Sequence, residues 1–211
     1  MRVIERRDVD ELILLDVAAT PNGRGPNFDL IREVCSNLFC PVTVGGGIKT
    51  LDHIRELLKC GADKVSLGTV AIDRLEFINE ASDKFGAQAI TISVDVRRGR
   101  VWSKCGVSDS GMLPVEWAME CERRGAGEIL LTDIDRDGTL GGYDLGLVRS
   151  VCDAVSIPVV AAGGCGSYSH AAQALDAGAH AVAAGAMFQF CDATPKGAAR
   201  YLKENGYQTR V

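Results

Sequence analysis

Short apolar runs alternate with longer amphipathic segments along most of this 211-residue chain. The runs are mostly apolar rather than regularly alternating, which is typical of strands in a parallel sheet that is covered on both faces. The segments between them, such as residues 28–38 and 51–60, have the length and pattern of helices. The pattern therefore predicts an α/β fold of repeated βα units, with seven strands at residues 11–17, 41–44, 64–67, 89–96, 127–134, 157–161 and 181–184.

The chain also repeats itself in a single register. Pro41 and Pro158 begin two similar segments, PVTVGGGIKTLDHIRELLKCGADKVSLG and PVVAAGGCGSYSHAAQALDAGAHAVAAG, which lie 117 residues apart. The same offset continues without a gap, and it pairs Glu11 with Glu128, Asp16 with Asp133, Gly46 with Gly163, Gly47 with Gly164, Gly61 with Gly178 and Gly68 with Gly185. A repeat of this length indicates a fold built from two like halves.

The strand at residues 89–96 ends in Asp95 and precedes the second copy, and its counterpart would lie before Met1. We therefore expect an α/β fold, a (β/α)8 TIM barrel of two repeated half-barrels that lacks strand one and its loop. Residues 1–211 would form one domain, with half-barrel one at 1–86, incomplete at its amino end, and half-barrel two at 87–211. The alternative is that another element, such as a strand of a partner chain, closes the barrel. Because natural stability is small, we expect the isolated chain to be marginally stable or to aggregate.

Charge and composition narrow the class of ligand. The net charge of −5 and the pI near 5.3 argue against nucleic-acid binding, which needs a basic excess, so a small ligand is expected. The eight cysteines contain no CxxC pair and no spacing that would form a zinc site with the three histidines. The sequence shows no secretory leader and no apolar run of about 18 residues. We expect a cytoplasmic protein without metal, cofactor or membrane contact.

Two glycine-rich turns follow strands at repeat-related positions, Gly45-Gly46-Gly47 and Gly163-Gly164 with Gly166. Backbone N–H groups of such a turn, together with the start of the next helix, can bind an anion without a basic side chain. The structural alternative is a tight turn between strand and helix. Each turn is partnered by the end of the next strand, Gly68-Thr69 or Gly185-Ala186. The pair predicts two phosphate sites and an elongated substrate that is phosphorylated at both ends.

Aspartates end three of the predicted strands, and such carboxylates supply general acid or base catalysis when burial shifts their pKa values. They are Asp16, Asp95 and Asp133, with Asp135 and Asp137 in the loop after the last. The structural alternative is a cap or turn residue, and it carries equal weight for Asp137, which precedes Gly138. Residues 96–99 are expected to form a loop over the barrel mouth, so Asp95 has no helix to cap. Asp95 is the best catalytic candidate.

Three charged residues, Glu11, Lys64 and Glu128, start strands and would face the barrel floor. Charges at that place are costly unless they are paired. They form either a salt-bridged plug or a gate for a small neutral molecule, and the residues alone favour neither.

The motifs DELILLDVAAT, PVTVGGGIKT, TISVDVRRG, GAGEILLTDIDRDGTLGGYD and IPVVAAGGCG together resemble the HisF family, the cyclase subunit of imidazole glycerol phosphate synthase. The resemblance covers essentially the whole chain. It implies a lyase/cyclase of histidine biosynthesis that receives ammonia from a HisH-type glutaminase in a heterodimer. That activity converts the small bisphosphorylated substrate PRFAR, a formimino carboxamide ribotide, to imidazole glycerol phosphate and AICAR.

The resemblance also assigns roles to residues. Asp95 matches one of two acid/base aspartates, and the other falls in the absent strand. Asp137, followed by Gly138, matches a substrate-contacting loop. One phosphate site is matched by Gly47, Gly68 and Thr69, the other by Ala162, Gly163, Gly164, Gly185 and Ala186, and three of four gate residues by Glu11, Lys64 and Glu128.

Some features depart from the family pattern. Gly68 stands where asparagine is usual, Ala162 where serine is frequent, and Cys105 where serine is usual. Residues 22–28 resemble HisF-like paralogues that help to amidate a surface-polysaccharide sugar with glutaminase-derived ammonia. Two further alternatives are a truncated, non-catalytic partner of the glutaminase and an isomerase of a bisphosphorylated ribotide. The isomerase would not predict the floor charges, and we favour the histidine-pathway cyclase.

Overall fold

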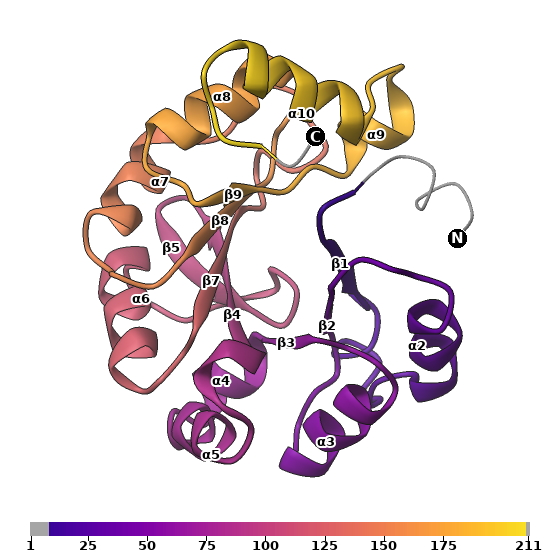
Figure 1. Ribbon diagram of the computed structural model, residues 1–211. Helices are drawn as coiled ribbons and strands as arrows, with labels where there is room; N and C mark the ends of the chain where they lie inside the picture. Colours follow the sequence, from indigo (N-terminus) through magenta and orange to yellow (C-terminus); the bar gives the residue numbers. More distant parts are fainter. Residues whose placement is uncertain (1–8, 210–211) are drawn as a thin grey trace.

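Seven parallel strands follow one another around a single curled sheet in the computed structural model, which describes residues 9–209 (Figure 1). Strands that are adjacent in space are also consecutive among the parallel strands of the chain, as in a (β/α) barrel. The predicted fold class, a TIM-barrel-like α/β fold, is confirmed. The strands are β1 (Leu12–Leu15), β2 (Val42–Gly45), β3 (Lys64–Leu67), β4 (Ile90–Arg97), β7 (Glu128–Asp133), β8 (Val159–Ala162) and β9 (Ala181–Val182).

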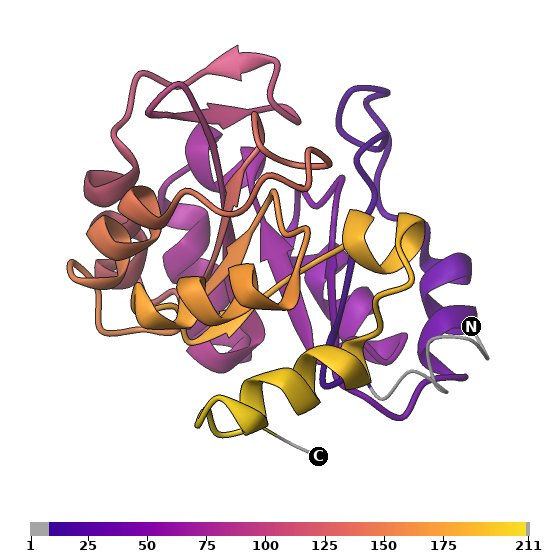
Figure 2. The ribbon, with the colours of Figure 1, turned by 90° about the horizontal axis from the view of Figure 1, so that it is seen from above.

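Helices cover the convex side of this sheet (Figures 1 and 2). Several begin at a residue whose side chain accepts a backbone N–H of the first turn, as Thr50 and Ser167 do, and this caps the helix. The helices are α2 (Phe28–Cys35), α3 (Leu51–Lys59), α4 (Thr69–Asp73), α5 (Glu76–Phe85), the short η1 (Ala87–Ala89), α6 (Pro114–Arg123), α7 (Leu145–Cys152), α8 (Tyr168–Asp176), α9 (Ala186–Phe190) and α10 (Pro195–Glu204).

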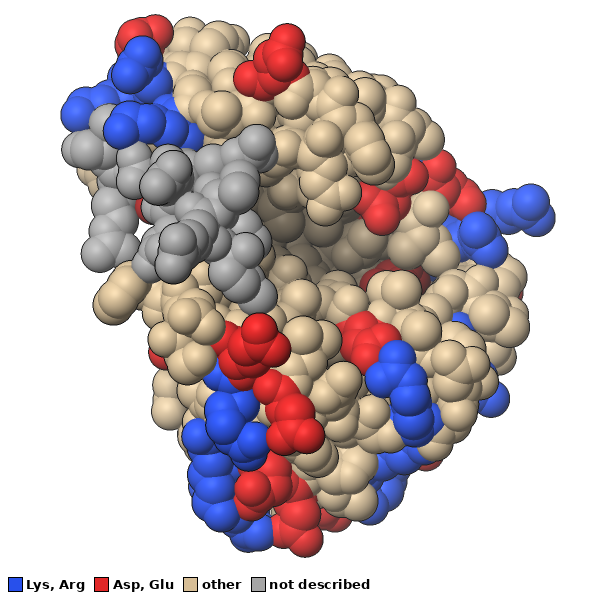
Figure 3. All heavy atoms as spheres, turned by 90° about the vertical axis from the view of Figure 1, so that its right-hand side faces the viewer, with Lys and Arg blue, Asp and Glu red and all other residues tan. Residues whose placement is uncertain are grey.

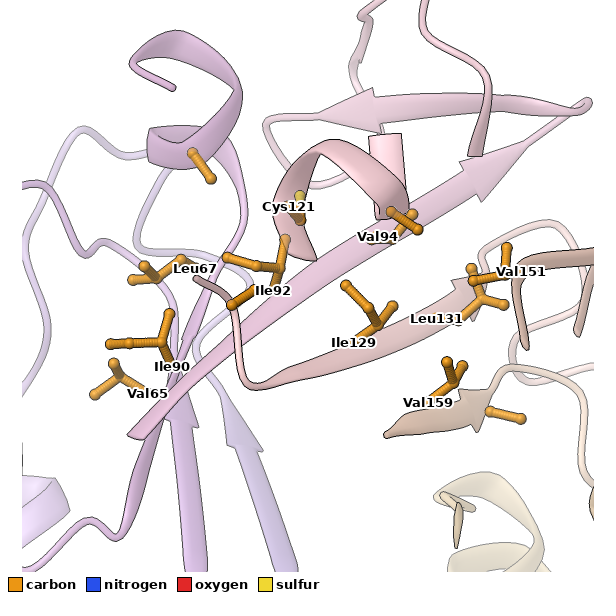
Figure 4. Close-up of a cluster of buried hydrophobic side chains, with 14 of the residues drawn as sticks. Val65, Leu67, Ile90, Ile92, Val94, Cys121, Ile129, Leu131, Val151 and Val159 are labelled. Carbon is orange, nitrogen blue, oxygen red and sulfur yellow. The ribbon is translucent and has the colours of Figure 1, made fainter. Parts of the chain in front are cut away.

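Alternation along the strands separates the core from the barrel interior. On β4, Ile90, Ile92 and Val94 are fully buried and belong to the cluster of core side chains that includes Cys121 of α6 and Val151 of α7 (Figure 4). Successive side chains of a strand point to opposite faces, so Thr91, Ser93 and Asp95 point into the barrel. The packing that buries the outer face therefore positions Asp95 inside.

The two copies of the repeat make matching backbone contacts. Leu12 N donates to Pro41 O at 2.9 Å, and Ile129 N donates to Pro158 O at the same distance. Gly61 and Gly178 both have a φ of 103°. These equivalences support the predicted half-barrels at 1–86 and 87–211, a division that remains a prediction and whose residues 1–8 and 210–211 lie outside the described part.

The segment after Asp95 is a hairpin, so the prediction of a loop at residues 96–99 was wrong. β4 runs on to Arg97 and turns at Arg98 and Gly99, which have φ values of 50° and 72°. Two positive φ values suit a two-residue hairpin turn, because its twist matches that of the flanking strands. The chain returns as β5 (Arg100–Ser103), which pairs with β4 and with β6 (Ser108–Asp109).

The curled sheet is open between β1 and β9, because no strand pairing joins them within residues 9–209. The surface is hollowed on this side, and mostly uncharged residues line the hollow (Figure 3). A cavity of about 430 Å³ lies along β1, the following loop and α2. Among the described residues, no helix has both the length and the apolar character needed to cross a membrane.

Candidate active site at the carboxyl ends of the strands

A cavity of about 260 Å³ opens at the carboxyl ends of the strands. It brings together six of the predicted site residues, namely Gly46, Gly47, Gly68, Thr69, Asp95 and Asp137. Asp16, Ser66, Ser93, Cys105 and Thr132 also line it. The first glycine turn and the best catalytic candidate therefore share one space, although they lie about 50 residues apart in the sequence.

Asp95 has the environment of a proton-transferring carboxyl group. Burial raises the pKa of Asp95, and the negative charge of Asp137 raises it further. Ser93 Oγ donates a hydrogen bond of 2.9 Å to Asp95 Oδ1, which favours the charged carboxylate and lowers the pKa. Burial and the charge of Asp137 outweigh this bond, so the pKa of Asp95 is raised overall. A raised pKa moves a carboxyl group toward the range in which it can both take up and release a proton near neutral pH.

The other two strand-end aspartates are bound by arginines. Arg24 donates to both oxygens of Asp16, at 2.6 and 2.9 Å, and this hydrogen bonding lowers the pKa of Asp16. Asp133 lies 3.3 Å from Arg136 Nε and accepts the backbone N–H of Asp135. Among the strand-end aspartates Asp16, Asp95 and Asp133, only Asp95 has no arginine or lysine in a salt bridge within the described part of the chain.

The glycine turns are compact in the same way in both halves. A Cβ atom at Gly46 would lie 2.4 Å from Asp16 O, and one at Gly163 would lie 2.3 Å from Asp133 O. Both residues have positive φ, 103° and 89°, so glycine is required by space and by conformation. Within residues 9–209 the N–H groups of Gly46, Gly47, Gly163 and Gly164 donate to no other residue. Tight packing explains the glycines, and the turns still keep donors that an anion could use.

The predicted residues of the second phosphate site lie on the same rim but outside this cavity. Ala162 ends β8, Gly163 and Gly164 follow it, and Gly185 and Ala186 begin α9. None of them lines the 260 Å³ cavity, to which β7 and the loop after it contribute Thr132, Ile134 and Asp137. Gly138 has a φ of 77° and is exposed in the loop after β7.

The hairpin after β4 lies over the cavity, at the barrel mouth where a loop at residues 96–99 was predicted. Lys104 N donates to Thr69 Oγ1 at 2.9 Å, and Cys105 Sγ donates to Val17 O at 3.1 Å. Arg97 braces the hairpin, because it binds Asp135 at 2.9 Å. Thr69, a predicted phosphate ligand, thus also anchors the hairpin that covers it.

Two residues that bind site aspartates were not singled out from the sequence: Ser93, which lines the cavity, and Arg24, which reaches Asp16 from the neighbouring cavity along β1. Ser93 is two residues before Asp95, so strand alternation already placed both on one face. Arg24 lies in the unusual segment 22–28, but its pairing with Asp16 depends on how the loop folds back.

The charged residues of the floor form a connected group. Lys64 Nζ lies 2.8 Å from Glu128 and 3.2 Å from Glu11, and Thr91 Oγ1 donates to Glu128 at 2.9 Å. Burial works to lower the pKa of Lys64, but the hydrogen bonds and charges of Glu128 and Glu11 outweigh it and raise that pKa. Within residues 9–209 there is no group of three or more histidine, cysteine, aspartate or glutamate side chains that could hold a metal ion.

Comparisons with known proteins agree with the motifs. A family model described as histidine biosynthesis protein matches residues 1–194. The imidazole glycerol phosphate synthase subunit HisF of Dictyoglomus thermophilum is 43% identical over an alignment of 215 residue positions. The alignment covers 100% of this chain and 85% of that relative. The predicted enzyme class, a lyase/cyclase of the imidazole glycerol phosphate synthase type, agrees with that relative's name. The chain belongs to the histidine biosynthesis protein family and is a homologue of HisF.

Proposed function

We propose that this protein is the cyclase subunit of imidazole glycerol phosphate synthase, which uses ammonia to convert PRFAR to imidazole glycerol phosphate and AICAR. The observation that carries the proposal is the placement of Asp95 beside the Gly46-Gly47 turn in one cavity at the carboxyl ends of the strands. In barrels of this kind that end is where active sites are built. The 43% identity to HisF supports the same reaction.

Asp95 acts as a general acid and base in this proposal. Its raised pKa lets it carry a proton to or from the substrate, and Ser93 holds its carboxyl group in place. Gly46, Gly47, Gly68 and Thr69 bind one phosphate, while Ala162, Gly163, Gly164, Gly185 and Ala186 bind the other. Asp137 and Gly138 contact the substrate between them.

The floor group admits ammonia that a HisH-type glutaminase releases. Glu11, Lys64 and Glu128 are linked by ion pairs at the end of the barrel opposite to Asp95. Such a group is stable while both glutamates are paired with Lys64, and it can open if Lys64 releases one of them. The proposed complex is therefore a heterodimer with the glutaminase seated on the floor.

The segment 22–28, which resembles sugar-amidating paralogues, suggests a second candidate for the molecule that accepts the ammonia. Arg24 of that segment binds Asp16 inside the candidate site. A loop that reaches the site can change what is bound there, and an amidated sugar of a surface polysaccharide is the alternative substrate.

The test is an assay of the full chain with PRFAR and an ammonium salt, and then with glutamine and the glutaminase. Formation of imidazole glycerol phosphate and AICAR in both supports the cyclase. Turnover should disappear in Asp95→Asn and persist in Asp83→Asn, a change at an exposed residue of α5. If the chain binds the glutaminase but no product forms, the non-catalytic alternative replaces the cyclase. If the chain forms an amidated sugar but no imidazole glycerol phosphate, the sugar-amidating paralogue replaces the cyclase.

A further inference from the structure

Two of the three histidines lie at equivalent positions of the repeat. His53 and His170 are separated by the same 117 residues as the glycine turns. Each is the third residue of the helix that follows its turn, α3 or α8. Both are half-buried. The role proposed above for the turns assigns nothing to them.

Each imidazole is bonded to the segment that leaves the turn. Lys49 N donates to His53 Nδ1 at 3.4 Å, and Gly166 N donates to His170 Nδ1 at 3.2 Å. The backbone N–H of each histidine is bonded in return to the helix cap, His53 to Thr50 Oγ1 and His170 to Ser167 Oγ. The histidine therefore ties the end of the glycine turn to the first turn of the helix. The arrangement resembles a capping box, but the ring accepts the N–H of the residue before the cap instead of that of the cap itself.

The same rings also contact the loop that follows the strand-end aspartate. A Cβ atom at Gly25 would lie 3.1 Å from His53 Cε1, and one at Gly142 would lie 3.5 Å from His170 Nε2. In the second half, Gly142 N also donates to Gly164 O at 2.7 Å. Each imidazole thus lies where two loops meet, one carrying the glycine turn and the other beginning with Asp16 or Asp133.

We propose that His53 and His170 are positioning residues that hold the two glycine turns in the shape that binds phosphate. The inference rests on the proposed function, because it takes the turns to be phosphate sites. Nδ1 must keep its lone pair to accept the backbone N–H, so the proton of the neutral ring sits on Nε2. The imidazole touches the loops rather than the phosphate, and it acts by limiting how far the turn can move.

The third histidine provides a matched control. His180 Nδ1 accepts Val159 N at 3.3 Å, which is the same kind of bond, but it lies at the start of a strand on the barrel floor. Its counterpart in the first half is Asp63, which accepts Val42 N at 2.8 Å. Removing the side chain of His180 therefore breaks an equal hydrogen bond far from the glycine turns.

The experiment is calorimetric titration of the full chain with inorganic phosphate. His53→Leu and His170→Leu should each weaken phosphate binding about three- to tenfold, the effect of losing one hydrogen bond that orders a binding loop. His53→Asn and His170→Asn should bind within about twofold of the unsubstituted chain, because asparagine Oδ1 can accept in the place of Nδ1. His180→Leu should leave phosphate binding unchanged. In the complex with the glutaminase, the leucine variants should raise KM for PRFAR and leave kcat nearly unaltered, since Asp95 is untouched.

The outcomes separate the two claims. If the unsubstituted chain binds phosphate and the leucine variants bind it equally well, the positioning role is wrong while the proposed function stands. The role is also wrong if asparagine fails to restore binding, or if His180→Leu weakens it as much. If the unsubstituted chain binds no phosphate, the proposed phosphate sites themselves fail, and this inference fails with them.

Discussion

Asp137 and Asp95 face one cavity, and the charge of Asp137 adds to burial in raising the pKa of Asp95. Asp95 lies near the end of β4 and Asp137 lies in the loop after β7. Strands β4 and β7 pair along six residues, so the two carboxyl groups come from neighbouring parts of the second half. A buried carboxyl group near another negative charge favours its protonated form. The fold thereby creates a proton donor at the place where the first glycine turn could hold a substrate.

Asp95→Asn should abolish turnover and at the same time raise the melting temperature at neutral pH. Because the pKa of Asp95 is raised in the folded state, its charged form costs folding free energy above that pKa. Stability of the unsubstituted chain should therefore increase as the pH falls through the raised pKa toward the ordinary value of 3.8, and the difference from the variant should shrink. Calorimetric melting curves of both proteins between neutral and acid pH measure this. An Asn variant that is less stable at neutral pH would contradict the burial argument.

Arg24→Met should return the pKa of Asp16 toward its ordinary value. The arginine holds that pKa low, so the pair stabilises the fold above the unfolded pKa of 3.8 and stops doing so as the pH falls through the lowered one. Both side chains are partly exposed, and the loss at neutral pH should be at most about 1 kcal/mol. NMR titration of Asp16 and denaturant unfolding measure the two effects. The control is Arg32→Met, which breaks an exposed pair with Asp29 and should not move the titration of Asp16.

Local pattern made much of this architecture predictable. The strand predicted at residues 64–67 has the bounds of β3, and the strand predicted at 89–96 placed Asp95 near the carboxyl end of β4. The predicted and observed bounds differ at the last strand. β9 was predicted at residues 181–184 but spans Ala181–Val182, although Ala183 N still donates to Ala161 O of β8 at 2.8 Å.

The contacts that complete the site were less accessible from sequence. Thr69 and Lys104 meet because a hairpin folds back over the cavity, and nothing in the pattern of residues 96–109 specifies that direction. The hairpin itself could have been recognised from Gly99, which permits a two-residue turn. The pairing of Arg24 with Asp16 spans eight residues of irregular loop, where no period relates the two.

Lys64→Met should destabilise the protein by about 1–3 kcal/mol at neutral pH, because Glu128 would keep a poorly solvated charge without its cation. Glu11→Gln should cost less, about 1 kcal/mol or below, since the side chain of Glu11 is 49% exposed. The pKa of Lys64 is raised, so its contribution is present below 10.5 and is lost as the pH rises through the raised value. Urea unfolding of the two variants makes the comparison. Equal losses would show that burial of Glu128 does not matter.

Gly46→Ala and Gly163→Ala should be severely and similarly destabilising, by roughly 3 kcal/mol or more, since each methyl group would meet a backbone oxygen. Gly99→Ala separates the steric effect from the conformational one. Gly99 also has a positive φ, 72°, but no atom lies within 4 Å of its added Cβ, so about 1 kcal/mol is expected. Denaturant unfolding of the three variants tests the order. A mild effect at one glycine turn and a severe effect at the other would contradict their structural equivalence.

The opening between β1 and β9 should accept one more strand, and the repeat predicts its register. Asp95 of β4 pairs with Thr132 of β7, so a strand added beside β1 in the equivalent register places its aspartate opposite Leu15. A second copy of residues 87–117 fused directly before Met1 would occupy that register, because the repeat is 117 residues long. The fusion should cover the exposed side chain of Leu15, remain monomeric and melt at a higher temperature than the unfused chain, since an eighth strand pairs two open edges. The control carries the same residues in scrambled order. If both fusions melt alike, the opening is not a strand-sized gap, and the two halves are not equivalent at this edge.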